Sequence, residues 1–153
     1  MINTTDFNTE GKPLRLHELD IEALAIYLNT NKIRTSQGKI YQPLHDGHID
    51  IVNDIARYKV IAAGRRYGKT LITVLMALAT LMQINRRVWI VAPDFSLTEK
   101  VFRELYYILV VQLKIIRPGK PGGGRARNQR GDYYLEMPWG SVLEAKSMEN
   151  VDG

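Results

Sequence analysis

The chain has 153 residues, of which 45% are hydrophobic and 24% are charged, and this suits one compact domain with a sizeable core. It contains no cysteine, which excludes a disulfide framework, thiol chemistry and a cysteine-based zinc site. The net charge of +5 is compatible with a nucleic-acid or polyphosphate partner, and ordinary proteins also carry such a charge. Because Met1–Phe7 lacks the pattern of a secretory signal and no apolar run approaches about 18 residues, we expect neither a signal peptide nor a membrane span.

The first part of the chain predicts an arm and two helices. Polar residues up to about Leu14 indicate a flexible arm. Apolar residues recur at helical spacing over His17–Leu28 and predict a helix. The basic, glycine-containing segment Ile33–Gln42 predicts a loop. A second helix is predicted over residues 46–57, with Asp46 or Gly47 as its cap.

The central stretch, Tyr58 to Leu71, has the sequence Tyr-Lys-Val-Ile-Ala-Ala-Gly-Arg-Arg-Tyr-Gly-Lys-Thr-Leu. Its β-branched start predicts a strand over Tyr58–Ala63, followed by a glycine-bearing loop and a helix, which is the order of a phosphate-binding P-loop. Glycines let backbone N–H groups turn toward an anion, and the start of the helix adds the positive end of its dipole. We expect Lys69 to reach the β- and γ-phosphates of a nucleotide and the Thr70 hydroxyl to bind Mg²⁺.

This motif departs from the full P-loop pattern. Ala63 occupies the position of the first glycine, and Gly64 follows it. The alternative interpretation is a solvated basic turn between two core elements. Tyr67 can pack on the nucleotide or on a neighbouring loop. The predicted nucleotide-binding residues of the loop are Ala63, Gly64, Arg65, Arg66, Tyr67, Gly68, Lys69 and Thr70.

The segment after the motif predicts further helix and strand. The helix that starts at the motif is apolar nearly all round to about Ile84, which is typical of a helix packed against a sheet. Arg87–Ala92 is a short apolar run and predicts a buried parallel strand. Ser96 is the predicted cap of a helix that extends to about Lys114. This alternation of strands and helices favours a parallel sheet with right-handed crossovers.

The last part of the chain predicts a mobile loop and a hairpin. Residues 117–131 are rich in glycine and basic side chains. Tyr133–Met137 and Ser141–Ala145 alternate around a turn that contains Trp139, which indicates a β-hairpin. Trp139 can pack in the core or stack on a base. The loop can contact DNA phosphates or be a solvated linker, and its basic residues are Arg117, Lys120, Arg125, Arg127 and Arg130.

From about Pro43 to Gly153 the sequence resembles the ATPase domain of the large subunit of phage terminase, the DNA-packaging motor. The strongest part is Ala63–Thr70, because the family's P-loop also replaces the first glycine and carries an arginine at the position of Arg65. Two further segments fit: Val91-Ala-Pro-Asp-Phe95, and Trp139-Gly-Ser141 with Leu143-Glu-Ala-Lys-Ser147.

The resemblance implies an α/β fold of the P-loop NTPase (ASCE-like) class, with a three-layer core, a mainly parallel sheet that is incomplete here, and a β-hairpin. Residues 1–42 would be an amino-terminal arm and helix, and residues 43–153 the front part of the ATPase domain. The implied activity is ATP hydrolysis with Mg²⁺, coupled to translocation of double-stranded DNA. The implied partners are DNA, the portal protein, the small terminase subunit and further copies in a ring, with no membrane involved. The implied location is the cytoplasm of an infected bacterial host.

The resemblance also implies roles for single residues. Arg65 would act with Lys69 in catalysis by stabilising charge that develops on the γ-phosphate, and the alternative is a solvated arginine. The family's adenine-binding glutamine falls by spacing on His48, and Gln42 is the nearest glutamine, so both are candidates for adenine binding. His48 can instead be a surface residue or a helix cap. Tyr41 can stack on the base or belong to the core.

One half of the family's site is missing. Its Walker B strand, an apolar run that ends in Asp-Glu, would follow Gly153. Asp94 follows an apolar strand, but Pro93 intervenes and no glutamate is adjacent, so a structural role at the strand end is favoured. No catalytic carboxylate is identifiable among the late acidic residues Glu136, Glu144 and Glu149. Two alternatives to a terminase therefore remain, a helicase-like nucleic-acid-dependent ATPase and a non-catalytic fragment that binds nucleotide or DNA.

Overall fold

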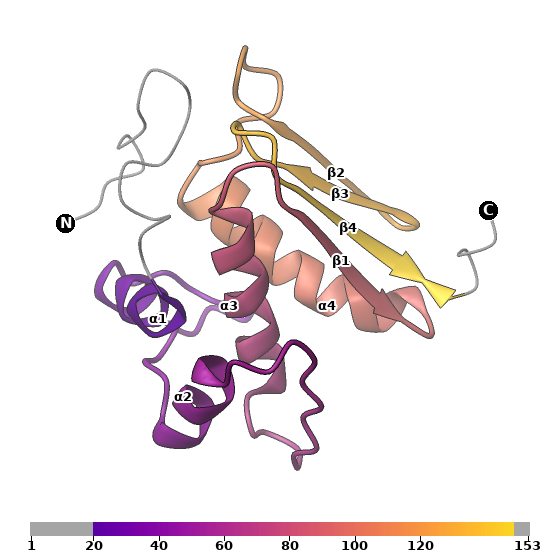
Figure 1. The fold of residues 1–153 in the computed structure, drawn as a ribbon. Coiled ribbons are helices and arrows are strands. Elements are labelled where there is room, and N and C mark those ends of the chain that lie inside the picture. Colours follow the sequence, from indigo (N-terminus) through magenta and orange to yellow (C-terminus); the bar gives the residue numbers. More distant parts are fainter. Residues whose placement is uncertain (1–19, 149–153) are drawn as a thin grey trace.

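The structure, a computed structural model, describes residues 20–148 (Figure 1). The predicted arm up to Leu14 and the candidate Glu149 lie outside the described residues. No helix in the described part is long and apolar enough to cross a membrane. The elements are α1 (Ile21–Thr30), α2 (Asp46–Asn53), α3 (Lys69–Leu81), β1 (Arg87–Ala92), α4 (Phe95–Tyr106), the π-helical segment η2 (Tyr107–Gln112), β2 (Arg125–Gln129), β3 (Asp132–Glu136) and β4 (Val142–Ser147).

The strands form one mixed sheet in the order β1-β4-β3-β2. The predicted α/β class is therefore confirmed, and the predicted mainly parallel sheet is wrong. Only β1 and β4 run parallel, whereas β2–β3 and β3–β4 are antiparallel pairs. The reason is local, because short turns join β2 to β3 and β3 to β4, and Gly131 and Gly140 adopt φ values of 87° and 92° in these turns. The hairpin predicted over residues 133–145 is confirmed.

The predicted mobile loop over residues 117–131 is wrong in its second half, where β2 pairs with β3. Gly124 makes this pairing possible, because its φ is +80° and a Cβ there would lie 2.2 Å from the carbonyl oxygen of Glu136. The strand is at the edge of the sheet and carries Arg125 and Arg127, and charged residues on an edge strand oppose pairing with another chain.

The described structure has two layers, whereas three were predicted. Figure 1 shows α3 and α4 on one side of the sheet, with α1 and α2 farther out on that side. On the other side, Trp89 and Val91 of β1 are 58% and 50% exposed. The predicted parallel pairing of β1 is confirmed, but its predicted burial is wrong, because β1 is at the edge of the sheet and the helices cover only one of its faces. The core lies between the sheet and the two inner helices, and includes Leu75, Leu78, Leu81, Phe102, Leu105, Leu135 and Leu143.

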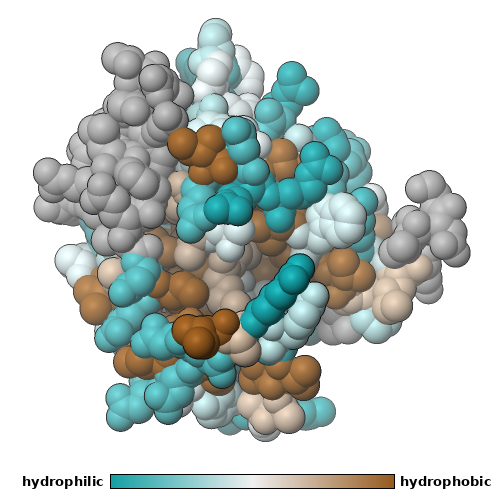
Figure 2. Space-filling model, viewed as in Figure 1, coloured by the Kyte–Doolittle hydropathy of each residue, from teal (hydrophilic) through white to brown (hydrophobic). Residues whose placement is uncertain are grey.

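The predicted strand Tyr58–Ala63 is also wrong. The segment between α2 and α3 contains no strand, and Ile55, Tyr58 and Val60 are 100%, 80% and 97% exposed. Figure 2 shows hydrophobic side chains at the surface in the lower part of the molecule, where α2 and this segment lie in Figure 1. β-branched residues fit a strand only when a neighbouring strand supplies hydrogen bonds and a packed face. In the described part of the chain no strand pairs with this segment, so the crossover predicted from it is absent.

Trp139 closes the hairpin against the end of α3. It is 6% exposed, and its indole N–H donates to the carbonyl oxygen of Leu81 at 2.7 Å. The Ser141 hydroxyl beside it donates to the carbonyl oxygen of Gln83 and accepts from the backbone N–H of Arg86. The packing role considered for Trp139 is therefore confirmed.

The loop between α1 and α2 is tied to α4 through one carboxylate. Glu104 accepts hydrogen bonds from the backbone N–H and the hydroxyl of Ser36 and, at 2.7 Å, from the Tyr41 hydroxyl. Tyr41 is 4% exposed, which confirms the core role that was one of its two alternatives. Burial raises the pKa of Tyr41 far above its usual 10.0, and the hydrogen bond to Glu104 raises it further. Since the pKa is raised in the folded state, this stabilisation is complete below pH 10.0 and declines as the pH rises above it.

We expect Glu104→Ala to lower the free energy of unfolding by about 1–3 kcal/mol, because three donors lose a charged acceptor. Urea denaturation followed by circular dichroism measures this change. The matched control is Asp50→Ala on α2, an exposed carboxylate, which should change stability by less than about 0.5 kcal/mol. Equal effects of the two substitutions would contradict the role of Glu104 in holding the loop between α1 and α2 against α4.

Candidate functional site

The start of α3 is open to an anion. Gly68 is the residue before the helix, has the left-handed φ of 93°, and provides no side-chain cap. The first N–H groups of a helix have no partner within the helix, and here no side chain replaces one. These N–H groups and the positive end of the helix dipole are therefore free to bind a negatively charged group.

Lys69 lies at this opening. It is exposed, and its amino group donates to the carbonyl oxygens of Ala63 and Gly64, the latter at 3.3 Å. The side chain thus folds back across the 63–70 loop. No carboxylate pairs with it within residues 20–148, so its positive charge is available to a ligand.

The other loop residues are placed less specifically. Arg65 and Arg66 are exposed and have no ion-pair partner in the part of the chain that the structure describes. Arg66 adopts a φ of 65°, which is unusual for a residue with a side chain. A Cβ at Gly64 would meet nothing within 4 Å, so only Gly68 is required by the backbone.

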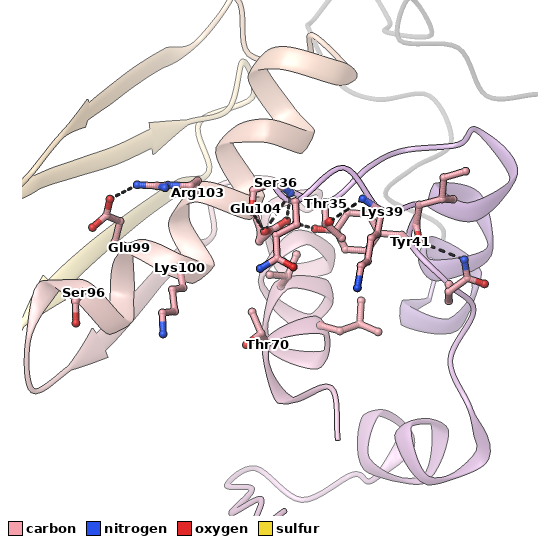
Figure 3. Close-up of a pocket in the computed structure, with 15 residues that line it drawn as sticks. Thr35, Ser36, Lys39, Tyr41, Thr70, Ser96, Glu99, Lys100, Arg103 and Glu104 are labelled. Atoms are coloured by element: carbon pink, nitrogen blue, oxygen red, sulfur yellow. Dashed lines mark hydrogen bonds and ion pairs between the residues drawn. The ribbon is translucent and has the colours of Figure 1, made fainter. Parts of the chain in front are cut away.

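A cavity of about 870 Å³ lies beside the first turn of α3 (Figure 3). Its walls are the loop 35–42, α3 and α4, and Thr70 belongs to both the 63–70 loop and the cavity. The Thr70 hydroxyl makes no hydrogen bond within residues 20–148. The volume is in the range of sites for small molecules and cofactors.

The charges in this cavity favour an anion. The carboxylate of Glu99 pairs with Arg103, and that of Glu104 holds Ser36 and Tyr41. Lys39 and Lys100 have no ion-pair partner in residues 20–148. In Figure 3 the Lys39 side chain extends from its loop toward the start of α3, and Lys100 extends from α4 on the opposite wall.

Gln42 and His48, the two candidates for adenine binding, lie in different surroundings. Gln42 lines the cavity together with Thr70, and its amide donates to the carbonyl oxygen of Ile40 at 3.2 Å. His48 does not line the cavity. It is 5% exposed, so the surface position considered for it is wrong, and its Nε2 lies 2.5 Å from the carbonyl oxygen of Tyr67. The cap of α2 is His45, which accepts from the backbone N–H of His48, and not Asp46 or Gly47.

No known protein family matches this chain, and no curated protein matches it.

The residues fit a magnesium ion only in part. Mg²⁺ retains several waters and binds through one or two protein ligands together with substrate phosphates, so one threonine hydroxyl at the end of the loop suits it. Among residues 20–148 no cluster of three acidic or histidine side chains could hold a metal without such a substrate.

The carboxylates considered in the sequence are engaged elsewhere. Asp94 accepts from the backbone N–H of Ser96 at 2.7 Å, so this aspartate caps α4, which starts at Phe95 and not after Ser96. Glu136 accepts from the Tyr134 hydroxyl and Glu144 from the Trp89 indole, both on the open face of the sheet. None of the three lines the cavity that contains Thr70.

The basic residues predicted to contact DNA are all exposed. Arg127 is partly neutralised, because it pairs with Asp132 at 2.8 Å and its guanidinium lies 4.1 Å from the centre of the Tyr134 ring. Lys39 and Lys100, which line the cavity, were not predicted from the sequence. No local pattern marks them, since they come from a loop and a helix that meet only in the folded chain.

Proposed function

We propose that this chain binds Mg²⁺ and ATP at the 63–70 loop and is the ATP-binding part of a viral DNA-packaging motor of the terminase type. One observation carries the proposal. The uncapped start of α3, the unpaired charge of Lys69 and the Thr70 hydroxyl meet beside a cavity of nucleotide size. Together they form a receptor for a phosphate chain attached to a larger organic group.

Each group has a defined role in this proposal. The N–H groups of the first turn of α3 donate hydrogen bonds to the phosphate oxygens, and Lys69 donates a charge-assisted hydrogen bond to the β- and γ-phosphates. Thr70 would hold Mg²⁺, which would supply positive charge beside the phosphates. The cavity between Lys39, Gln42 and Lys100 receives the nucleoside and orients it by polar contacts. Arg65 stabilises the charge that develops on the γ-phosphate.

Double-stranded DNA is the proposed substrate of the motor. The turn before β2, the strand itself and the turn after it present Lys120, Arg125, Arg127 and Arg130 to solvent, and such side chains bind phosphates without reading sequence. The portal protein, the small terminase subunit, a ring of copies and the host cytoplasm are proposed from the family resemblance alone.

A second candidate function is nucleotide binding without turnover. It is favoured by the cavity's carboxylates, because Glu99 and Glu104 are both held by other side chains. Hydrolysis needs a group that positions and polarises water, and within residues 20–148 neither of these two is free to do so.

Calorimetric titration with ATP, AMP and tripolyphosphate, each with Mg²⁺, tests the binding proposal. ATP should bind at least tenfold more tightly than AMP, because the loop contacts phosphates that AMP lacks. Equal affinity for ATP and AMP would contradict it. Phosphate release with and without double-stranded DNA separates the two functions. Steady, DNA-stimulated release supports the motor, and binding without release supports the second candidate.

A further inference from the structure

His48 lies directly beneath the 63–70 loop. Its ring stacks on His45 with centroids 3.4 Å apart, and the Tyr67 ring meets it edge-on at 5.3 Å. Its Nε2 is 2.5 Å from the carbonyl oxygen of Tyr67. Because a carbonyl only accepts hydrogen bonds, Nε2 carries the proton and donates it.

This bond acts on the peptide that leads into α3. The Tyr67 carbonyl belongs to the peptide unit whose nitrogen is that of Gly68, the left-handed residue immediately before Lys69. Holding that carbonyl fixes the plane of the peptide unit. The orientation of this plane sets the direction of the Gly68 N–H and the position of the Lys69 backbone.

Two glycines permit the close approach. A Cβ at Gly68 would lie 2.8 Å from His48 Nε2, and a Cβ at Gly47 would lie 2.5 Å from the Tyr67 hydroxyl. A side chain at either position would require His48 or Tyr67 to shift. The first turn of α2 and the 63–70 loop are thus fitted to each other at the position of the histidine.

Neither ring nitrogen of His48 is available to a nucleotide base. Nε2 is used by the loop, and Nδ1 is buried without a hydrogen-bond partner in the described residues. Gln42, in contrast, lines the cavity that also contains Thr70.

We propose that His48 is a positioning residue, which fixes the Tyr67–Gly68 peptide so that the loop can receive phosphates, and that it does not recognise the base. This inference rests on the proposed nucleotide binding. It predicts that the contribution of His48 is the same for every polyphosphate, whether or not a base is attached.

The test compares the affinities of wild-type protein, His48→Phe and His48→Gln for ATP, GTP and tripolyphosphate, each with Mg²⁺, by calorimetry. His48→Phe keeps a ring beside His45 and Tyr67 but removes the donor. This variant should bind all three ligands more weakly by the same factor, about 3- to 10-fold for the loss of one hydrogen bond. His48→Gln carries an amide donor that can reach the same carbonyl, and it should restore at least half of the lost binding energy for all three.

Asn53→Ala is the control, because Asn53 is an exposed, uncharged residue at the end of α2, whereas His48 lies in the first turn of that helix. It should change the affinity for tripolyphosphate less than twofold. Thermal unfolding of each variant checks the fold, and His48→Ala replaces His48→Phe if the larger ring destabilises the protein.

Two results would overturn this inference and leave the proposed function intact. One is a loss of affinity confined to ATP, which would indicate a contact with the base. The other is an unchanged affinity of His48→Phe for all three ligands. Wild-type protein that binds none of the three ligands would overturn the proposed function, and the inference with it.

Discussion

Lys69→Ala is expected to abolish measurable ATP binding. In the proposed site this lysine donates to phosphates, and within residues 20–148 its partners are the carbonyl oxygens of Ala63 and Gly64. A charge-assisted hydrogen bond contributes about 1.5–3 kcal/mol, so a single lost contact weakens binding roughly 10- to 150-fold. Here the same side chain also folds across the 63–70 loop, and its removal loosens the loop that presents the backbone N–H groups.

Calorimetry with ATP and Mg²⁺ measures this effect. The control is Lys120→Ala, which removes an equal charge from an exposed turn remote in sequence from the loop. Its ATP affinity should stay within twofold of wild type. Unchanged binding by Lys69→Ala would show that the 63–70 loop is only a basic turn, the alternative that the sequence left open.

Trp139→Ala is expected to lower the free energy of unfolding by about 3–5 kcal/mol. Loss of a large buried aromatic side chain leaves a cavity and removes its packing contacts. In this protein it also leaves the Leu81 carbonyl without its indole donor, at the point where the hairpin meets the end of α3. Because domains of this kind are stable by only about 5–15 kcal/mol, the variant should lose a large part of its stability.

The chain supplies a matched control in its other tryptophan. Trp89 is 58% exposed, although its indole donates to Glu144 and Lys146 lies over its ring. Trp89→Ala should cost no more than about 1 kcal/mol. Urea denaturation of both variants compares them directly. A cost for Trp89→Ala as large as that for Trp139→Ala would mean that the open face of the sheet is buried in solution.

Elements whose signal is local could be predicted from the sequence. β1 has the predicted bounds Arg87–Ala92, and α3 begins at the predicted loop, because an apolar run and a glycine followed by a good helix former suffice for each. The β3–β4 hairpin follows from alternation around a turn with Gly140. The candidate residues of the 63–70 loop are consecutive in the sequence, so they could be predicted without knowledge of the fold.

Everything that depends on a distant partner was decided by the tertiary structure. Val60 and Ile61 have strand propensity, but no described strand accepts their hydrogen bonds, so the segment stays irregular. β2 forms because Gly124 lets its backbone approach Glu136, a contact that no local pattern reveals.

The same reason separates the two adenine-side candidates. The resemblance offered His48 by its spacing and Gln42 by its residue type, whereas packing buries His48 against Tyr67 and leaves Gln42 on a cavity with Thr70 and Lys100. Residue types and their local order therefore determined which chemistry this chain can offer. Hydrogen-bond partners and close approaches between distant segments determined where each group lies, because burial and pairing are properties of the whole chain and not of any stretch within it.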